Sequence, residues 1–184
     1  TNPEGERVLL DRGIAILPDR VAEFRAGVAK AIEYARTLGA PQLNCLAGKT
    51  PAGVADAVLR NTLIENLRYA AGEFKRAGLK LLVEPINTYD IPGFYLSRSA
   101  QTIEVLDEVG ADNAYLQYDI YHMQRMEGEL AATMHKLLPR IAHLQLADNP
   151  GRNGPGTGEI DYAFLFKLLD RIGYSGWIGC EYKP

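Results

Sequence analysis

Four side chains with oxygen donors each stand at the end of a short apolar stretch of the sequence. In chain order they are Glu84, Asp119, Gln145 and Glu181. Three carboxylates and one amide oxygen form a hard-oxygen set, which suits Mg²⁺ or Mn²⁺ and suits a structural zinc ion poorly. A cation held between carboxylates polarises a carbonyl, while a nearby glutamate carries a proton between neighbouring carbons. The pattern therefore predicts isomerase or epimerase chemistry.

Two other side chains are placed where they could contact a substrate. His122 follows Asp119 by three residues, within reach of a substrate oxygen. Arg152 lies in a glycine-rich loop at residues 148–160, where its forked guanidinium would suit a substrate carboxylate. The alternatives are a histidine packed in its loop and a solvated surface arginine.

Five more residues have a structural interpretation. His143 points to the same side of its strand as Gln145 and is expected to be a core histidine. Glu159 is expected to cap the helix that follows it, and Lys183 to be solvated. The two cysteines, Cys45 and Cys180, fall in predicted strands and are expected to be small buried residues in a reducing compartment.

Helical and strand patterns alternate along the chain. Apolar residues three and four apart indicate helices, with Asp19 expected to cap the first of them and Gly39 to end it. Short apolar runs between the helices indicate strands. The expected helices are 19–38, 52–77, 99–108, 129–138 and 162–172, and the expected strands are 41–46, 79–84, 114–119, 141–146 and 177–181.

Such alternation predicts an α/β protein with a parallel sheet covered by helices. A doubly wound open sheet and a (β/α)8 TIM barrel both satisfy it. The barrel is favoured because polar residues end four successive strands, where a barrel gathers its active site. A barrel usually has about 250 residues. We therefore expect residues 1–184 to be a single partial barrel domain that lacks roughly the first three strands and the last helix, and to be poorly soluble or oligomeric when isolated.

Composition excludes several classes of protein. The chain is 47% hydrophobic and 23% charged, as in ordinary globular proteins, and its net charge is −3. This balance gives no general attraction to nucleic acid or to an anionic membrane. No apolar run reaches the 18 residues or so that a spanning helix needs. We expect a cytoplasmic protein that binds a small molecule, and a homo-oligomer is one option.

Five segments of the chain stand out as motifs. They are Val83–Asn87 (VEPIN), Tyr118–Gln124 (YDIYHMQ), His143–Arg152 (HLQLADNPGR), Gly156–Ile160 (GTGEI) and Gly176–Pro184 (GWIGCEYKP). Together they resemble one known family, the hydroxypyruvate isomerases of the xylose isomerase-like barrel superfamily. The resemblance implies that the enzyme interconverts hydroxypyruvate and 2-hydroxy-3-oxopropanoate (tartronate semialdehyde).

The same resemblance implies a role for each site residue. Glu84 and Glu181 would be the two acid/base residues, and together with Asp119 and Gln145 they would surround the metal, Mg²⁺ or Mn²⁺. Gln145 would take the place of a histidine found in the related ketose 3-epimerases. The substrate-contacting positions of those epimerases are matched here by His122 and Arg152.

Other functions stay open from the sequence. A 2-oxo-tetronate isomerase or a ketose 3-epimerase would use the same chemistry on another substrate. The abasic-site endonucleases of the superfamily use a histidine-rich three-zinc site, and the chain's three histidines and negative net charge argue against that class. A barrel that binds a sugar acid without catalysis is the remaining alternative.

Overall fold

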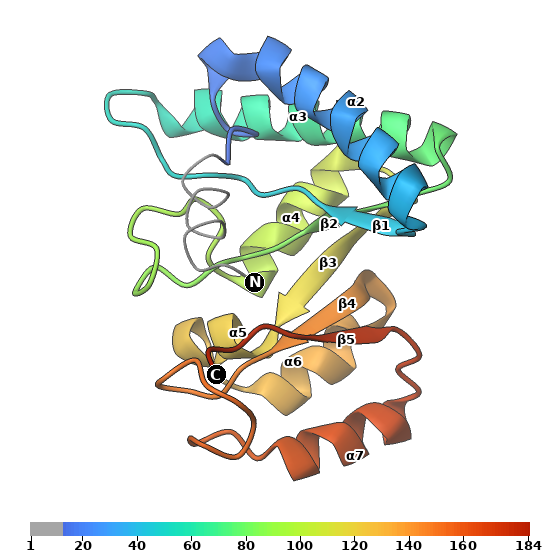
Figure 1. The fold of residues 1–184 in the computed structure, drawn as a ribbon. Coiled ribbons are helices and arrows are strands. Elements are labelled where there is room, and N and C mark those ends of the chain that lie inside the picture. Colours follow the sequence, from blue (N-terminus) through green and yellow to red (C-terminus); the bar gives the residue numbers. More distant parts are fainter. Residues whose placement is uncertain (1–12) are drawn as a thin grey trace.

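The computed structural model describes residues 13–184 and contains a five-stranded parallel sheet in the order β1-β2-β3-β4-β5 (Figure 1). Each strand pairs with its neighbours in the sequence, as the repeated strand-helix pattern predicts. The strands are β1 (Gln42–Asn44), β2 (Lys80–Val83), β3 (Ala114–Asp119), β4 (Ile141–Leu146) and β5 (Trp177–Cys180).

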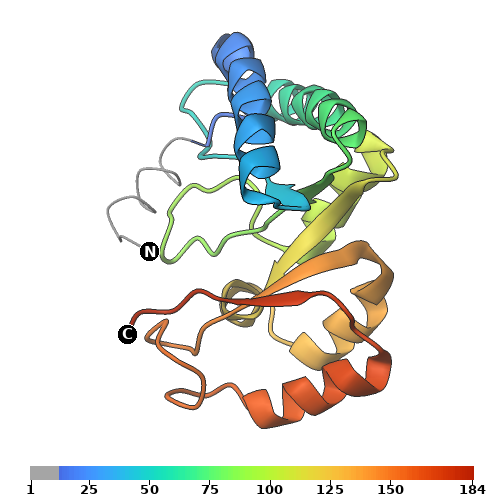
Figure 2. The same ribbon diagram turned by 45° about the vertical axis from the view of Figure 1, so that its right-hand side comes forward.

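The helices cover the outer side of the curved sheet, with α2 and α3 next to β1 and β2 and with α6 and α7 next to β4 and β5, except that the short α5 lies past the carboxyl end of β3 (Figures 1 and 2). They are α2 (Val21–Leu38), α3 (Asp56–Arg76), α4 (Ser99–Val109), α5 (Ile120–Met126), α6 (Leu130–Leu137) and α7 (Tyr162–Ile172), with short 3-10 turns η1 (Pro18–Arg20) and η2 (Leu138–Arg140). No described helix is long and apolar enough to cross a membrane.

Helix ends follow the local chemistry, with three corrections. Gly39 adopts a left-handed φ of 68° and ends α2 as expected. The expectation for Asp19 is wrong, because it lies in the turn η1 and α2 begins after it without a side-chain cap. Glu159 does not cap α7, because the carboxylate of Asp161 accepts the Phe164 N–H at 2.9 Å. Helix α5 was not expected, since seven residues are too few to show a period.

Strand β2 is apolar on both faces. Leu81, Leu82 and Val83 of β2 are all buried, as is typical of a parallel strand covered on both sides. Burying each such side chain contributes about 1.5–3 kcal/mol. The exposed Trp177 in β5, by contrast, marks this strand as an edge of the described sheet.

The two cysteines are both free thiols but differ in exposure. Cys45 follows β1 and is partly buried, and burial raises the pKa of its thiol to about 12. Cys180 is exposed at the end of β5, so the prediction of a buried residue is wrong there. Its strand lies at the edge of the described sheet, where no further described strand pairs with it on the open side.

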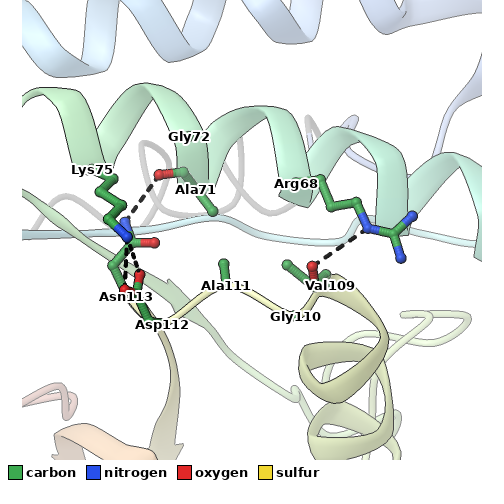
Figure 3. A pocket seen from close by; sticks show the side chains of 9 residues that line it. All are labelled: Arg68, Ala71, Gly72, Lys75, Val109, Gly110, Ala111, Asp112 and Asn113. Carbon is green, nitrogen blue, oxygen red and sulfur yellow. Dashed lines mark hydrogen bonds and ion pairs between the residues drawn. The ribbon is translucent and has the colours of Figure 1, made fainter.

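A hollow of about 360 Å³ lies at the amino end of β3, between α3 and the turn after α4 (Figure 3). Its polar side chains bind one another or the backbone. Lys75 pairs with Asp112 at 2.7 Å, and the Asn113 amide donates to the carbonyls of Ala71 and Leu79 at 3.0 and 3.1 Å. This end of the sheet therefore holds α3, α4 and β3 together.

Candidate active site

The strand ends opposite this hollow collect the predicted site residues. In the sheet register Asp119 of β3 lies beside Gln145 of β4, and Gln145 lies beside Gly179 of β5. Glu84 directly follows β2, and Glu181 follows β5, its N–H donating to the Leu146 carbonyl at 3.0 Å. Parallel strands thus bring residues almost a hundred positions apart to one edge of the sheet.

An acidic pair forms the centre of the site. Ligand atoms of Glu84, Asp119 and His122 all lie within 4.8 Å of one another, and all three residues are buried. Burial and the charge of Asp119 raise the pKa of Glu84 to about 8. Among the described residues, Oδ2 of Asp119 has no hydrogen-bond partner. Two neighbouring buried carboxylates, one of them with an oxygen that accepts no hydrogen bond, would be stabilised by a cation. Glu84, Asp119 and His122 could therefore hold a metal ion.

A chain of side-chain amides links the two glutamates. Asn44 donates to Oε2 of Glu84 at 2.6 Å, and Gln117 donates to the same oxygen at 2.8 Å. Gln117 also donates to Oε1 of Gln145, and Nε2 of Gln145 donates to Oε2 of Glu181 at 2.7 Å. One polar network therefore contains a residue from β1, β3 and β4 and the residues that directly follow β2 and β5.

Sequence reasoning missed Asn44 and Gln117. The signal for Gln117 was available, because it precedes Asp119 by two residues and must face the same side of β3. Nothing in the sequence around Asn44 separates it from a solvated strand residue, and only the pairing of β1 with β2 brings it to Glu84.

The four predicted ligands lie together but do not form one ligand group in this structure. Glu84 and Asp119 are close neighbours, and His122 joins their group. Glu181 is not part of that group, and the Gln145 oxygen accepts a hydrogen bond from Gln117. The four-residue metal shell stays a prediction.

Arg152 enters the site from the loop after β4. Its Nη2 lies 3.1 Å from Oε1 of Glu181, and its guanidinium stacks 5.5 Å from the centre of the Tyr121 ring. The side chain is largely buried, with 13% of its surface exposed, which rules out the alternative of a solvated surface arginine. An arginine beside a carboxylate and a ring is well placed to exchange its partner for a substrate carboxylate.

The buried carboxylate of Asp148 organises this loop. It accepts backbone N–H groups of Asn149, Gly156 and Ile160 at 2.9, 2.8 and 3.1 Å. Burial opposes its ionisation, yet these backbone hydrogen bonds lower the pKa of Asp148 below its usual range. At position 158 only glycine fits, because a Cβ there would lie 2.0 Å from the Asn149 carbonyl oxygen. Asp148 thereby fixes the backbone from which Arg152 extends.

Lys183 matches its structural interpretation, and His143 matches its own in part. Nδ1 of His143 lies 3.1 Å from Nε2 of Gln42, below the carboxylates, and burial lowers its pKa. His143 is therefore a half-buried histidine whose ring contacts a partner in the neighbouring part of the sheet. The Lys183 side chain is exposed, and its backbone N–H donates to the Arg152 carbonyl at 2.7 Å.

A family model described as xylose isomerase-like TIM barrel matches residues 7–184. The chain belongs to this family. It is 55% identical over 182 residues to hydroxypyruvate isomerase of Escherichia coli, and the match covers 99% of the chain and 70% of that relative. The barrel expected from the sequence is thus confirmed at the level of the family.

Two other similarities bear on function. The chain is 42% identical to 2-oxo-tetronate isomerase of Cupriavidus necator, with 95% of the chain and 67% of the relative covered. A solved structure described as an AP endonuclease of family 2 from Brucella melitensis superposes with a TM-score of 0.92 at 37% identity, over 99% of this chain and 70% of that one. The sequence-based resemblance to hydroxypyruvate isomerases is confirmed, and both curated relatives are isomerases.

Proposed function

We propose that this protein is an aldose-ketose isomerase that interconverts hydroxypyruvate and 2-hydroxy-3-oxopropanoate. The observation that carries the proposal is the buried acidic pair of Glu84 and Asp119, joined by a chain of amides to Glu181 and faced by Arg152. The relative from Escherichia coli supports the choice of substrate.

The site residues fit a divalent cation, which we take to be Mg²⁺ or Mn²⁺. Burial and the neighbouring charge of Asp119 raise the pKa of Glu84, and within the described residues Oδ2 of Asp119 has no hydrogen-bond partner, so a cation would be stabilised here. Oxygens of Glu84, Asp119, Gln145 and Glu181 would hold the ion after small side-chain rotations. When bound, the ion supplies Lewis-acid polarisation of the substrate carbonyl.

Proton transfer falls to the two glutamates. One of them takes a proton from C3 of hydroxypyruvate, the carbon that bears the hydroxyl group, and leaves an enediolate. A proton is then delivered to C2, and the proton on the C3 oxygen moves to the C2 oxygen, so that the product has the same atoms as the substrate. In the metal-free site, burial and the charge of Asp119 raise the pKa of Glu84 to about 8, and a cation bound to the same carboxylate would lower that pKa and leave Glu84 ready to accept a proton.

Arg152 and His122 would orient the substrate. The guanidinium of Arg152 pairs with Glu181, and a carboxylate group of the substrate would replace Glu181 as its partner. His122 lies against Asp119 and would contact a substrate oxygen. This arrangement favours small acids over neutral sugars.

A four-carbon 2-oxo acid is the second candidate substrate, because 2-oxo-tetronate isomerase is also a close relative. An endonuclease is disfavoured, since the acidic group in the described residues contains one histidine and the chain carries a net charge of −3. A barrel that only binds a sugar acid would not need two glutamates joined across the site.

The test is an NMR assay in D₂O with Mg²⁺, using hydroxypyruvate, 2-oxo-tetronate and a neutral ketose as separate substrates. We expect conversion of hydroxypyruvate with deuterium entering the product, and slower or no conversion of the neutral ketose. Faster turnover of the tetronate would assign the protein to the four-carbon acid. Absence of conversion and of exchange with every substrate would refute the isomerase proposal.

A further inference from the structure

The loop after β2 contains a fully buried amide, Asn87, that contacts His122. Oδ1 of Asn87 accepts the backbone N–H of Asp90 at 2.8 Å, and Nδ2 of Asn87 donates to Oδ2 of Asp90 at 3.0 Å. The same Nδ2 lies 2.7 Å from Nδ1 of His122. The amide thus joins a loop residue to a residue of the site.

The partners of Asn87 fix which way its amide points. A backbone N–H can only donate, and an ionised carboxylate can only accept. Reversing the amide would place its NH₂ against the N–H of Asp90 and its oxygen against the carboxylate, which removes two hydrogen bonds and creates two repulsive contacts. The NH₂ group of Asn87 therefore faces His122.

Asp90 is itself held in place from α5. Its carboxylate accepts the Tyr121 hydroxyl at 2.7 Å and pairs with Arg125 at 2.7 Å. Burial acts to raise the pKa of Asp90, but the hydrogen bonds and the charge of Arg125 together lower it. The anchor of the Asn87 amide is thus a carboxylate that stays ionised.

A donor facing Nδ1 determines where the proton of His122 lies. Nδ1 must offer its lone pair to the Asn87 NH₂, so the neutral ring carries its proton on Nε2. In a doubly protonated ring, the Nδ1–H of His122 would face the NH₂ group of Asn87, and two hydrogen-bond donors would oppose each other. Nε2 faces Oδ2 of Asp119 at 3.7 Å, and a nitrogen that bears a proton has no lone pair for a metal ion.

We propose that Asn87, oriented by Asp90, is a positioning residue that holds His122 in the Nε2-protonated tautomer, so that His122 donates a hydrogen bond to a substrate oxygen and does not ligate the metal. The part about the substrate rests on the proposed isomerase function; the part about the tautomer does not. The proximity of His122 to Glu84 and Asp119 thus reflects a shared substrate pocket, and the metal would be left to oxygen ligands.

The tautomer can be read directly by NMR of the protein labelled with ¹⁵N in its histidine rings. Protonated and unprotonated ring nitrogens resonate in separate ranges, and the variant His122→Gln assigns the signals among the three histidines. We expect His122 to show an unprotonated Nδ1 and a protonated Nε2, both without Mg²⁺ and with saturating Mg²⁺. An Nδ1-protonated ring, or loss of the Nε2 proton when Mg²⁺ is added, would overturn the proposal.

The variant Asn87→Asp tests the cause. A carboxylate at this position can only accept, so it draws the proton to Nδ1, and we expect the His122 tautomer to switch. The matched control is Asn113→Asp at the opposite end of the sheet, where a half-buried amide also donates to two acceptors. The control should lower thermal stability and leave the His122 signals unchanged. An unchanged tautomer in Asn87→Asp would contradict the positioning role.

Kinetics then separate this proposal from the proposed function. If both hold, Asn87→Asp raises KM for hydroxypyruvate or lowers kcat by about 10-fold or more, since the Nε2–H donor of His122 to the substrate is lost. The control variant keeps the kinetics of the unmodified protein. Should no substrate turn over while His122 still shows the Nε2 proton, the isomerase function fails and the tautomer assignment stands.

Discussion

The two ends of the sheet contain similar acidic and amide residues, but they differ in how completely the charges and hydrogen-bonding groups of these residues are paired. At the amino end, Lys75 neutralises Asp112 and the Asn113 amide donates to the Ala71 carbonyl (Figure 3). The same amide also donates to the Leu79 carbonyl. At the carboxyl end, Glu84 and Asp119 are buried side by side, and an oxygen of Asp119 lacks a hydrogen bond within the described part of the chain. The carboxyl end thus carries uncompensated negative charge, which is typical of a functional site, whereas the charges at the amino end are compensated, which is typical of a structural contact.

The largest effect is expected from the glutamates. Glu181→Gln keeps the size and one oxygen of the side chain but cannot accept a proton, so kcat should fall by about 10² to 10⁴. The value of kcat is measured by stopped-flow or NMR. Saturating Mg²⁺ is used because the amide also weakens metal binding, which would otherwise lower the measured rate. A kcat close to that of the unmodified protein would reduce Glu181 to a ligand and leave the two-base mechanism unsupported.

Arg152 should show the opposite kinetic pattern. Its guanidinium is expected to bind the substrate carboxylate equally in the ground state and in the transition state. Arg152→Ala should therefore raise KM by about 10- to 100-fold and lower kcat by less. Arg152→Lys is the control, because lysine keeps the positive charge but cannot donate the paired hydrogen bonds of a guanidinium. A selective fall in kcat would instead place Arg152 in proton transfer, through its contact with Glu181.

Adding a cation should remove the imbalance at the carboxyl end. We expect Mg²⁺ to raise the free energy of unfolding, by about 2.7 kcal/mol at a hundred times its Kd, measured as a shift in Tm. Asp119→Asn retains an oxygen that can cap α5 but removes the charge, so it should abolish most of this stabilisation. An equal Mg²⁺ effect in that variant would locate the ion elsewhere.

The pH dependence of stability offers a second measure of the imbalance. The pKa of Glu84 is about 8 in the folded protein and 4.5 in its ordinary state, so the folded protein binds the extra proton between these values. In the metal-free protein, the stabilisation from protonated Glu84 is therefore full below about pH 4.5 and is lost as pH rises through about 8. The free energy of unfolding should fall by at most about 1.4 kcal/mol per pH unit in this range.

Burial and the charge of Asp119 raise the pKa of Glu84 and so widen this pH range, whereas hydrogen bonds from Asn44 and Gln117 and the charge of Arg152 lower the pKa. Denaturant unfolding of the metal-free protein across this range measures the slope. Glu84→Gln should flatten the curve between about pH 5 and 8, since the variant has no proton to lose there. An equally steep curve in that variant would assign the slope to other groups.

The smallest effect on function is expected at the amino end. Asn113→Ala removes hydrogen bonds to two carbonyls and should lower the free energy of unfolding by about 1–3 kcal/mol. Its kcat and KM should match those of the unmodified protein, because the residue lies at the opposite end of β3 from Asp119. A clear change in kcat would show that the two ends are coupled, and the comparison would need revision.

The sequence by itself determined the alternation of strands and helices and the positions of the strand-end residues. Glu84, Asp119, Gln145 and Glu181 could be placed at one edge because the carboxyl ends of parallel strands must lie on the same side. Gly39 could be assigned to a helix end because a left-handed φ favours glycine. These inferences need only local conformation and one rule of topology.

Tertiary structure alone decided which of these residues touch. The contact of Asn87 with His122 spans 35 positions, and that of Asn44 with Glu84 spans 40. A polar side chain in a loop or strand carries no local mark of its distant partner, since hydrogen bonds of this kind form only after the strands have packed. The orientation of one amide, and through it the proton on His122, therefore depends on the folded protein as a whole.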